Sequence, residues 1–111
     1  MRHWFRSYWT EEDTWFYFEV DTDGWVTRQV DLQGPFEQPI AAASLAERQA
    51  AQAAGTLADS EKEFGATAEL PVQDWDGHEP HDLTIEEFET AWLAARIACQ
   101  AGARNRATDG A

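Results

Sequence analysis

Cysteine, long apolar runs and positive charge are all scarce in this sequence. Cys99 is the single cysteine, so no internal disulfide forms, and this favours a reducing compartment. No stretch approaches the roughly 18–20 apolar residues of a membrane span. The first residues, MRHWFRSYW, lack the apolar core and small-residue cleavage site of a signal peptide. We therefore expect a cytoplasmic protein with no membrane contact.

The shortage of positive charge is the most informative feature of the composition. Lysine and arginine number 8 against 21 aspartate and glutamate residues, which leaves a formal net charge of −13 at pH 7. Such a field repels nucleic-acid phosphates and anionic lipids, so it disfavours direct binding to either. It accelerates the encounter with a basic protein, because opposite fields attract. The alternative is that the acidity serves only solubility.

The strongest local pattern is TWFYFEVDTDGWVTRQVDL, residues 14–32. Two runs of aromatic and β-branched residues flank an Asp/Gly cluster at residues 21–24, and this combination predicts a β-hairpin. Alternation places three side chains on one face of the first strand: Phe16, Phe18 and Val20. The other face carries Trp15, Tyr17 and Glu19. On the return strand the apolar face comprises Val26, Val30 and Leu32, interrupted by Arg28.

Further elements follow from similar patterns. Residues 2–9 predict a strand before the hairpin, and a short fourth strand is expected around residues 40–42. Capping boxes at residues 44–47 and 84–87 predict helices over about 45–64, with a possible division at Gly55, and over 85–101. Gly102 is expected to end the second helix. The prediction is a single α+β domain over residues 1–102, followed by a disordered tail over 103–111.

The predicted architecture is a three- to four-stranded antiparallel sheet, an N-terminal meander packed on one face by two helices. Aromatic residues exceed the needs of so small a core. We expect the core to take Phe16, Phe18, Phe88 and Trp92. The opposite sheet face is then left to Trp4, Trp9, Trp15, Tyr17 and Trp25, either as an exposed protein-binding patch or covered by another element.

No catalytic or cofactor motif is present, so neither an enzyme nor a cofactor is predicted. His78, His81 and Asp76 carry metal-ligand chemistry, but the proline between the two histidines disfavours a shared helical face. A solvated acidic loop is the favoured interpretation. The Asp/Gly cluster at 21–24 resembles the start of a calcium loop, yet its twelfth position is Leu32 instead of glutamate. A hairpin turn is favoured there.

The hairpin and the later stretch -LTIEEFETAW- together resemble a group of small, uncharacterised bacterial domains found in actinomycetes and elsewhere. These domains share an acidic hairpin turn followed by an Arg-x-Val/Ile strand, and a closing helix of the form Ile-x-x-Glu-Glu-Phe-Glu-x-x-Trp. The resemblance covers about residues 2–32 and 83–95. Some relatives are similar to immunity proteins of bacterial toxin systems, which are commonly small, acidic and non-enzymatic. The resemblance therefore implies a binding role and carries over no catalytic residue.

The leading hypothesis is a non-enzymatic acidic module that binds a basic protein, such as an immunity or inhibitor protein. The candidate partner-binding residues are Trp15, Tyr17, Trp25, Glu11, Glu12 and Asp23. One alternative is a small metal-binding protein or enzyme that uses the loop with His78 and His81. Another is mimicry of DNA, in which the carboxylates of this protein imitate phosphates and so occupy a nucleic-acid-binding protein.

Overall fold

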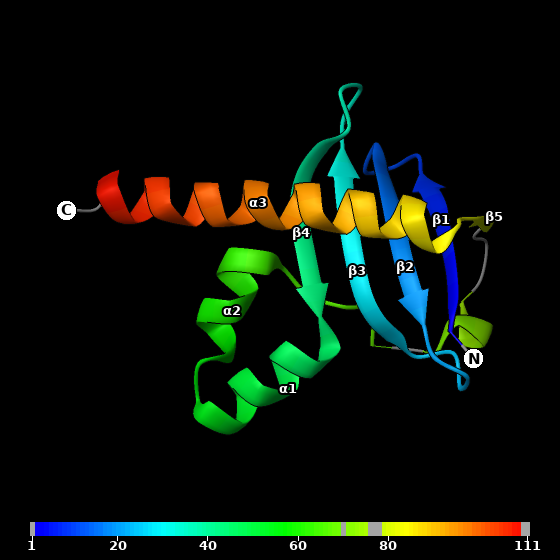
Figure 1. The fold of residues 1–111 in the computed structure, drawn as a ribbon, viewed down its shortest axis with the longest axis horizontal. Coiled ribbons are helices and arrows are strands. Elements are labelled where there is room, and N and C mark those ends of the chain that lie inside the picture. Colours follow the sequence, from blue (N-terminus) through cyan, green and yellow to red (C-terminus); the bar gives the residue numbers. More distant parts are fainter. Residues whose placement is uncertain (1, 70, 76–78, 110–111) are drawn as a thin grey trace.

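Four consecutive strands form an antiparallel meander, and a short fifth strand extends it at one edge (Figure 1). The strands are β1 (His3–Trp9), β2 (Thr14–Val20), β3 (Val26–Gln33), β4 (Gln38–Ser44) and β5 (His81–Asp82). Their order across the sheet is β4-β3-β2-β1-β5. The computed structural model describes residues 2–69, 71–75 and 79–109, with 103–109 described by their backbone alone. The predicted α+β class and antiparallel meander are confirmed, whereas β5 was not predicted because two residues carry no periodic pattern.

The turn between β2 and β3 is held by the side chain of Asp21. Its Oδ1 accepts hydrogen bonds from the backbone N–H groups of Asp23 and Trp25, each at 3.0 Å. Gly24 completes the reversal with a φ of 88°, a conformation that L side chains rarely adopt. The Asp21 carboxylate therefore stabilises the turn by accepting backbone hydrogen bonds, which confirms the predicted hairpin turn.

The register of the hairpin shifts near its turn. Glu19 lies opposite Arg28, but Val20 lies opposite Val26, so Thr27 is the extra residue of a β-bulge. A bulge reverses the faces of the residues beyond it. Val26 consequently packs with Val20, and its predicted placement on the same face as Val30 is wrong.

Three α-helices follow the meander: α1 (Leu45–Ala54), α2 (Leu57–Phe64) and α3 (Ile85–Asp109). Both predicted capping motifs form. The Ser44 hydroxyl accepts a hydrogen bond from Glu47 N–H at 3.4 Å, and Thr84 exchanges two hydrogen bonds with Glu87 at 3.1 and 2.9 Å. Gly55 is left-handed, with a φ of 78°, and divides the first predicted helix into α1 and α2.

The predicted end of α3 at Gly102 is wrong. The helix continues through Gly102 to Asp109, over the stretch that the sequence predicted to be a disordered tail. One glycine inside a helix costs only about 1 kcal/mol relative to alanine, and the alanine and arginine residues around it are strong helix formers. Among the described residues, no helix has the length and apolar character needed to cross a membrane.

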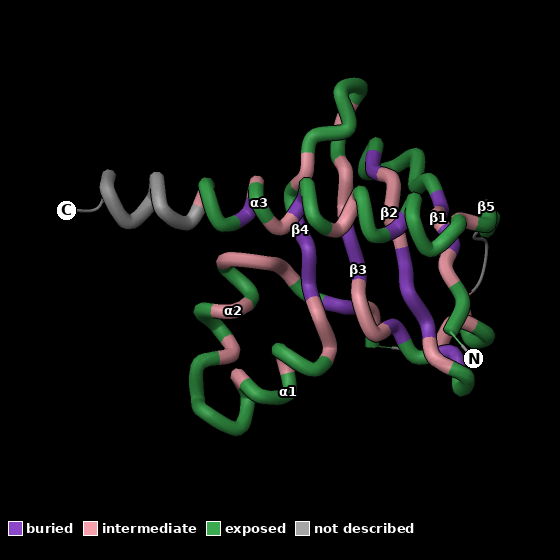
Figure 2. Tube along the Cα trace, in the orientation of Figure 1, coloured by how far each residue is buried: buried purple, intermediate pink, exposed green. Residues whose placement is uncertain are grey.

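Helix α3 crosses one face of the sheet, which we call the helix face (Figure 1). Its Phe88 and Ala95 form a fully buried cluster with Val30 and Ala42. The partly buried residues around that cluster are Trp4, Tyr17, Leu32, Phe64, Leu83 and Trp92. Figure 2 shows the buried stretches concentrated in the middle of the sheet, whereas the turns and most of α1 and α2 are exposed.

The opposite face of the sheet is crossed by a segment that we call the strap, residues 65–69 and 71–75. It begins beside Ala41 on β4, and the Ala68 N–H then donates to Gln29 Oε1 on β3 at 2.8 Å. It ends at Trp75, whose ring centroid lies 4.8 Å from that of Phe18 on β2. We call this side the strap face.

The helices and the strap divide the two faces differently from the prediction. The strap face carries a second core cluster of Phe5, Phe18, Val20 and Val26, with Phe16 beside it. The expectation that Phe88 and Trp92 pack against Phe16 and Phe18 is therefore wrong. Both faces of this hairpin are aromatic, so alternation alone does not determine which face receives the helix.

Candidate binding surfaces at the turn end of the sheet

The six predicted partner-binding residues do not come together at one place. Glu11 and Glu12 lie in the turn between β1 and β2, at the end of the sheet that we call the turn end. Asp23 and Trp25 lie in the turn between β2 and β3, at the opposite end. The seven residues of β2 separate these turns by roughly 20 Å at the usual rise of a strand.

Trp15 and Tyr17 lie between the two turns, half-buried on the helix face. Arg6 from β1 covers both rings, because its guanidinium carbon is 4.3 Å from the Trp15 ring centroid and 5.8 Å from that of Tyr17. The guanidinium also donates to the Tyr17 hydroxyl at 3.1 Å. These contacts hold the two aromatic rings in place beside α3.

An apolar row crosses the helix face at the turn end. The strand register places Tyr8 opposite Trp15, Trp15 opposite Leu32, and Leu32 opposite Pro39. Tyr8 and Trp15 are in ring contact, with centroids 5.2 Å apart. We call these four residues the turn-end row.

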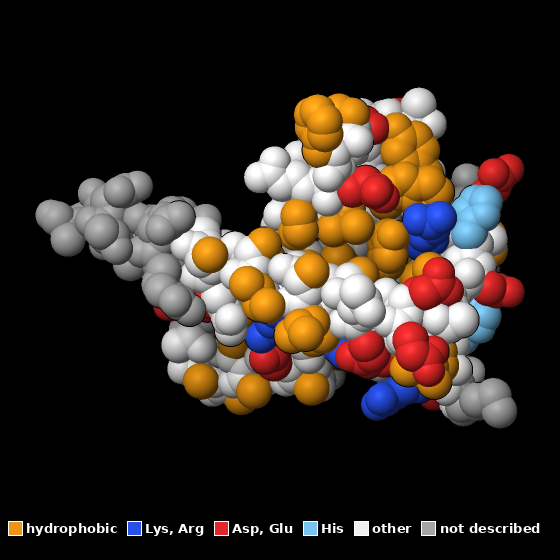
Figure 3. All heavy atoms as spheres, turned by 45° about the horizontal axis from the view of Figure 1, so that its top comes forward, with side chains coloured by type: hydrophobic (Ala, Val, Ile, Leu, Met, Phe, Trp, Pro, Cys, Tyr) orange, Lys and Arg blue, Asp and Glu red, His pale blue; other side chains and the backbone are white. Residues whose placement is uncertain are grey.

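Two exposed side chains extend the turn-end row. Phe36, at the tip of the β3–β4 turn, is 93% exposed, and Ile40 is 49% exposed. Figure 3 shows hydrophobic side chains gathered on the surface between these turns and α3. An apolar surface of this kind is unusual unless something binds there.

Carboxylates surround the turn-end row. Asp13 accepts a hydrogen bond from the Tyr8 hydroxyl at 2.5 Å, and this bond raises the pKa of Tyr8. On the α3 side a shallow groove carries Glu86 and Glu87 next to Arg6 and Tyr17. Figure 3 shows acidic side chains on both sides of the hydrophobic surface. The surface therefore combines apolar contacts with a negative rim, the arrangement of a protein interface.

A second hollow, the aromatic groove, lies on the strap face at the same end of the sheet. It has a volume of about 330 Å³, and its lining residues are Trp9, Glu12, Phe16, Phe18, Gln29, Ala68 and Trp75. The rings of Phe16 and Phe18 are nearly parallel, with an interplanar angle of 11°. The Trp9 ring lies edge-on to Phe16 at 6.0 Å, and the Trp75 ring edge-on to Phe18 at 4.8 Å. The groove is thus bounded by an indole at each end.

Asp31 borders the aromatic groove. It lies directly opposite Phe16 across the β2–β3 ladder, and its Oδ1 accepts a hydrogen bond from Gln29 Nε2 at 3.0 Å. Burial is the main reason that the pKa of the Asp31 carboxyl rises to about 6; the hydrogen bond from Gln29 opposes this rise, and the nearby charge of Glu12 adds to it. The groove is therefore lined by one carboxylate, Glu12, and a second, poorly solvated carboxylate, Asp31, lies next to it.

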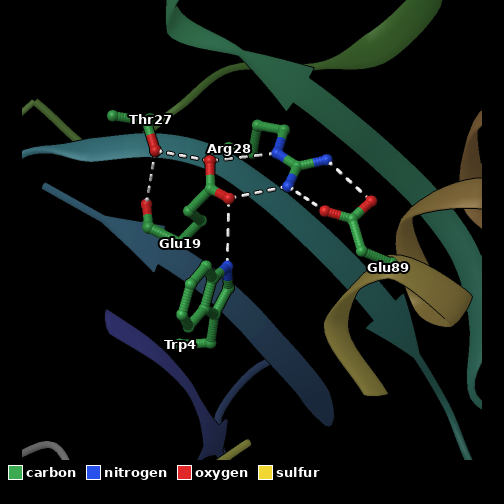
Figure 4. A network of polar contacts seen from close by, with 5 residues as sticks. All are labelled: Trp4, Glu19, Thr27, Arg28 and Glu89. Atoms are coloured by element: carbon green, nitrogen blue, oxygen red, sulfur yellow. Dashed lines mark hydrogen bonds and ion pairs between the residues drawn. The ribbon is translucent and has the colours of Figure 1, made fainter. Parts of the chain in front are cut away.

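Near the opposite end of the sheet, Glu19 lies at the centre of a polar network (Figure 4). It receives hydrogen bonds from Trp4 Nε1 at 3.0 Å and Thr27 Oγ1 at 2.8 Å, and two from Arg28 at 3.0 and 2.6 Å. Burial alone would raise the pKa of Glu19, but these donors outweigh it and lower the pKa to about 2. Both oxygens are occupied and the carboxylate stays ionised, so Glu19 is unsuited to proton transfer. Its role is structural.

Arginine residues elsewhere are also paired within the chain. Arg28 contacts Glu89 as well as Glu19, while Arg48 pairs with Glu61 and Arg96 with Glu47. These ion pairs neutralise much of the small positive charge internally. The remaining carboxylates therefore dominate the field that a partner meets.

The metal hypothesis rests mainly on residues outside the described part of the chain, because His78 and Asp76 are not described. His81 is exposed on β5, and its ring lies edge-on to Trp15 at a centroid distance of 5.9 Å. Within residues 2–69, 71–75 and 79–109, no group of three or more potential ligands from histidine, cysteine, aspartate and glutamate is found. Cys99, on α3, is buried.

Comparison with known proteins gives no further guide. The chain matches no protein-family model, and searches of curated proteins and of solved structures found no match either.

Sequence reasoning overlooked the aromatic groove. Alternation alone places Trp9 on the same face of β1 as Phe5, and Phe16 and Asp31 share the face opposite to Trp15. The groove was missed because Trp9 was grouped on one sheet face with the other tryptophans. Trp75 has no local signal, since the strap brings it there from 57 residues beyond Phe18 along the chain.

Proposed function

We propose that this protein is a non-enzymatic binding module that uses the turn end of its sheet to dock a basic protein. The observation that carries the proposal is the turn-end row, Tyr8, Trp15, Leu32 and Pro39, extended by the exposed Phe36. Hydrophobic anchors of this kind supply binding energy at a protein interface, and the carboxylates around them favour a positively charged partner.

An immunity or inhibitor protein is the form of this function favoured by the resemblance in sequence. Covering a basic active site requires complementary charge and a few aromatic anchors, and it requires no chemistry by the inhibitor. Glu11 and Glu12 are exposed at the turn end and would contribute to such a contact. Trp25 and Asp23, at the opposite end, would lie outside it.

The proposal is tested by capturing proteins from lysate of the source organism on immobilised wild-type protein and on Phe36→Ser. The expected result is a protein with an isoelectric point above neutrality that is retained by wild type and at least tenfold less by Phe36→Ser. Its affinity should fall steeply as ionic strength rises, because exposed charges are screened. Ile97→Ser, at an exposed apolar residue of α3 outside the turn-end row and its acidic rim, is the matched control and should retain the partner.

Two outcomes would contradict the proposal. Equal retention by wild type and Phe36→Ser, together with a loss on Trp25→Ser, would move the interface to the opposite end of the sheet. Competition by duplex DNA for the captured protein would instead favour mimicry of DNA, because the partner would then be a nucleic-acid-binding protein.

A further inference from the structure

We infer that the aromatic groove on the strap face receives an arginine side chain from the basic partner. This inference rests on the proposed function and adds to it the chemical group that the second surface recognises. The groove is lined by four aromatic rings and the Glu12 carboxylate in a volume of about 330 Å³, and Asp31 lies beside the lining residues Phe16 and Gln29. That volume lies at the lower end of the range for sites that enclose small organic groups.

The lining of the groove suits a cation with an apolar stem. The rings of Trp9, Phe16 and Trp75 offer π-faces and apolar contact, which attract organic cations and cover their methylene groups. Glu12 and Asp31 add negative charge at the border. An anionic or purely apolar ligand would not neutralise the negative charge of these two carboxylates.

Asp31 supports this interpretation independently. Its carboxyl lies beside a charge of the same sign, and burial and that charge together raise its pKa. Gln29 donates a hydrogen bond to Asp31 but is neutral, so it does not balance the negative charge of the carboxylate. A cation bound in the groove would supply the counter-charge and lower the pKa of Asp31.

The guanidinium group is favoured over an ammonium by its flat, forked shape. It stacks on aromatic rings and donates two parallel hydrogen bonds to a carboxylate, whereas lysine offers a compact charge that is more strongly hydrated. The chain uses the same combination twice in its own structure. Arg96 lies 3.6 Å from the Phe64 ring centroid and pairs with Glu47, and Arg28 combines the Phe88 ring with Glu19.

Position and charge indicate that the arginine comes from the protein's partner. The groove and the turn-end row lie on opposite faces of the same end of the sheet, since Tyr8 and Trp9 are consecutive on β1. A partner that docks over the turn end would reach both. The net charge of −13 makes an arginine-rich surface the complementary one.

The test uses three capped tripeptides, Gly-Arg-Gly, Gly-Lys-Gly and Gly-citrulline-Gly, titrated into ¹⁵N-labelled full-length protein in the millimolar range. The arginine peptide should shift the indole N–H signals of Trp9 and Trp75 and the side-chain amide of Gln29. The lysine peptide should bind several-fold more weakly. Citrulline, which keeps the shape without the charge, should cause no shift.

Variants of the groove complete the test. The double variant E12Q/D31N should weaken binding of the arginine peptide at least tenfold, and Phe16→Leu should weaken it several-fold. Asp59→Asn removes one exposed charge from α2 and should bind as wild type does. Asp31→Asn also removes an unfavourable buried charge, so weaker binding by a protein of equal or greater stability would not reflect unfolding.

The inference is overturned if the arginine peptide causes no shift, if citrulline binds equally well, or if E12Q/D31N binds unchanged. These peptides report on the groove without any captured protein. Arginine binding without a basic partner would therefore contradict the proposed function alone. Capture of a basic partner without arginine binding would contradict the groove alone.

Discussion

At the scale of single residues, a buried carboxylate, Glu19, and a half-buried one, Asp31, lie on neighbouring strands and behave in opposite ways. Glu19 is surrounded by donors, which lower its pKa to about 2, whereas Asp31 has one neutral donor and a like charge nearby, and its pKa rises to about 6. Burial raises the pKa of both carboxyls, so the number and charge of the hydrogen-bond donors decide whether the net shift of the pKa is downward or upward. Glu19 therefore stabilises the fold near neutral pH, whereas the charge of Asp31 weakens it.

Replacement of Glu19 by glutamine is expected to lower the free energy of unfolding by about 3 kcal/mol at pH 7. The amide would direct a donor at Arg28 in place of an acceptor. Because the folded pKa lies below the unfolded value of 4.5, the stabilisation by Glu19 is present above about pH 4.5 and is lost as the pH falls towards 2. Urea unfolding of wild type and Glu19→Gln from pH 7 to pH 3 measures this difference.

Glu89→Gln is the control for the Glu19 experiment. Glu89 contacts the same arginine from the exposed side, where an ion pair contributes at most about 1 kcal/mol. A difference between wild type and Glu19→Gln that stays constant down to pH 3 would contradict the assigned pKa.

Asp31→Asn should show the opposite dependence on pH. The folded pKa lies above the unfolded value of 3.8, so the wild type gains stability from protonation below about pH 4 and loses it as the pH rises through about 6. The variant should exceed wild type by up to about 3 kcal/mol at pH 7.5 and match it near pH 4. Urea unfolding at these two pH values provides the measurement, and an Asp31→Asn variant less stable than wild type at pH 7.5 would contradict it.

At the scale of elements, the strap determines which part of the strap face stays open. It is fixed at one end by the hydrogen bond from Ala68 to Gln29 and at the other by that from Val72 N–H to the Gly24 carbonyl at 2.8 Å. It therefore covers the half of the sheet near the β2–β3 turn. The half near Trp9 and Phe16 remains uncovered by the strap and forms the groove.

The close approach of the strap to β4 predicts a specific effect of Gly65→Ala. A Cβ at Gly65 would lie 2.7 Å from Ala41 Cβ, and the φ of +84° disfavours alanine as well. Gly34 has nearly the same φ, +83°, but a Cβ there would meet no atom within 4 Å. Both variants carry backbone strain from the positive φ, and this strain is greater at Gly65, whose ψ of −157° lies in a region almost restricted to glycine; only Gly65→Ala adds the collision.

Urea unfolding should therefore show Gly65→Ala to be less stable than Gly34→Ala by at least about 1 kcal/mol. Gly34→Ala reports the cost of a positive φ without any collision, so the excess loss in Gly65→Ala reports what is specific to the strap. Equal losses in the two variants would mean that the strap moves away from Ala41 at little cost.

At the scale of the whole molecule, the charge of −13 opposes folding and favours association with a basic surface. Raising ionic strength from about 0.01 M to 0.15 M shortens the screening length from roughly 30 Å to 8 Å. Repulsion among the exposed carboxylates should weaken, and the melting temperature should rise by several degrees. Calorimetry at pH 7.5 measures the change, and a melting temperature that falls with added salt would show that exposed ion pairs outweigh the repulsion.

Most of the strands and helices, and their local chemistry, follow from the sequence alone; β5 and the true end of α3 do not. The hairpin, the two capping motifs and the α+β class follow from patterns within about twenty residues, because alternation, turn residues and caps act locally. Alternation along β2 also predicts that Phe16 and Trp15 lie on opposite faces of the sheet. The charge argument for a basic partner also needs only the composition.

The tertiary structure decided which face receives α3, where the strap runs and which side chains stay open. Phe16 and Trp15 are both aromatic, so the sequence pattern allows either face of β2 to be covered by α3. Which face is covered depends on where Phe88 of α3 and Trp75 of the strap pack, and both come from distant parts of the chain. The bulge at Thr27, which moves Val26 to the other face, likewise depends on pairing between strands. The aromatic groove exists because segments remote in sequence meet around it, and no local pattern encodes such a meeting.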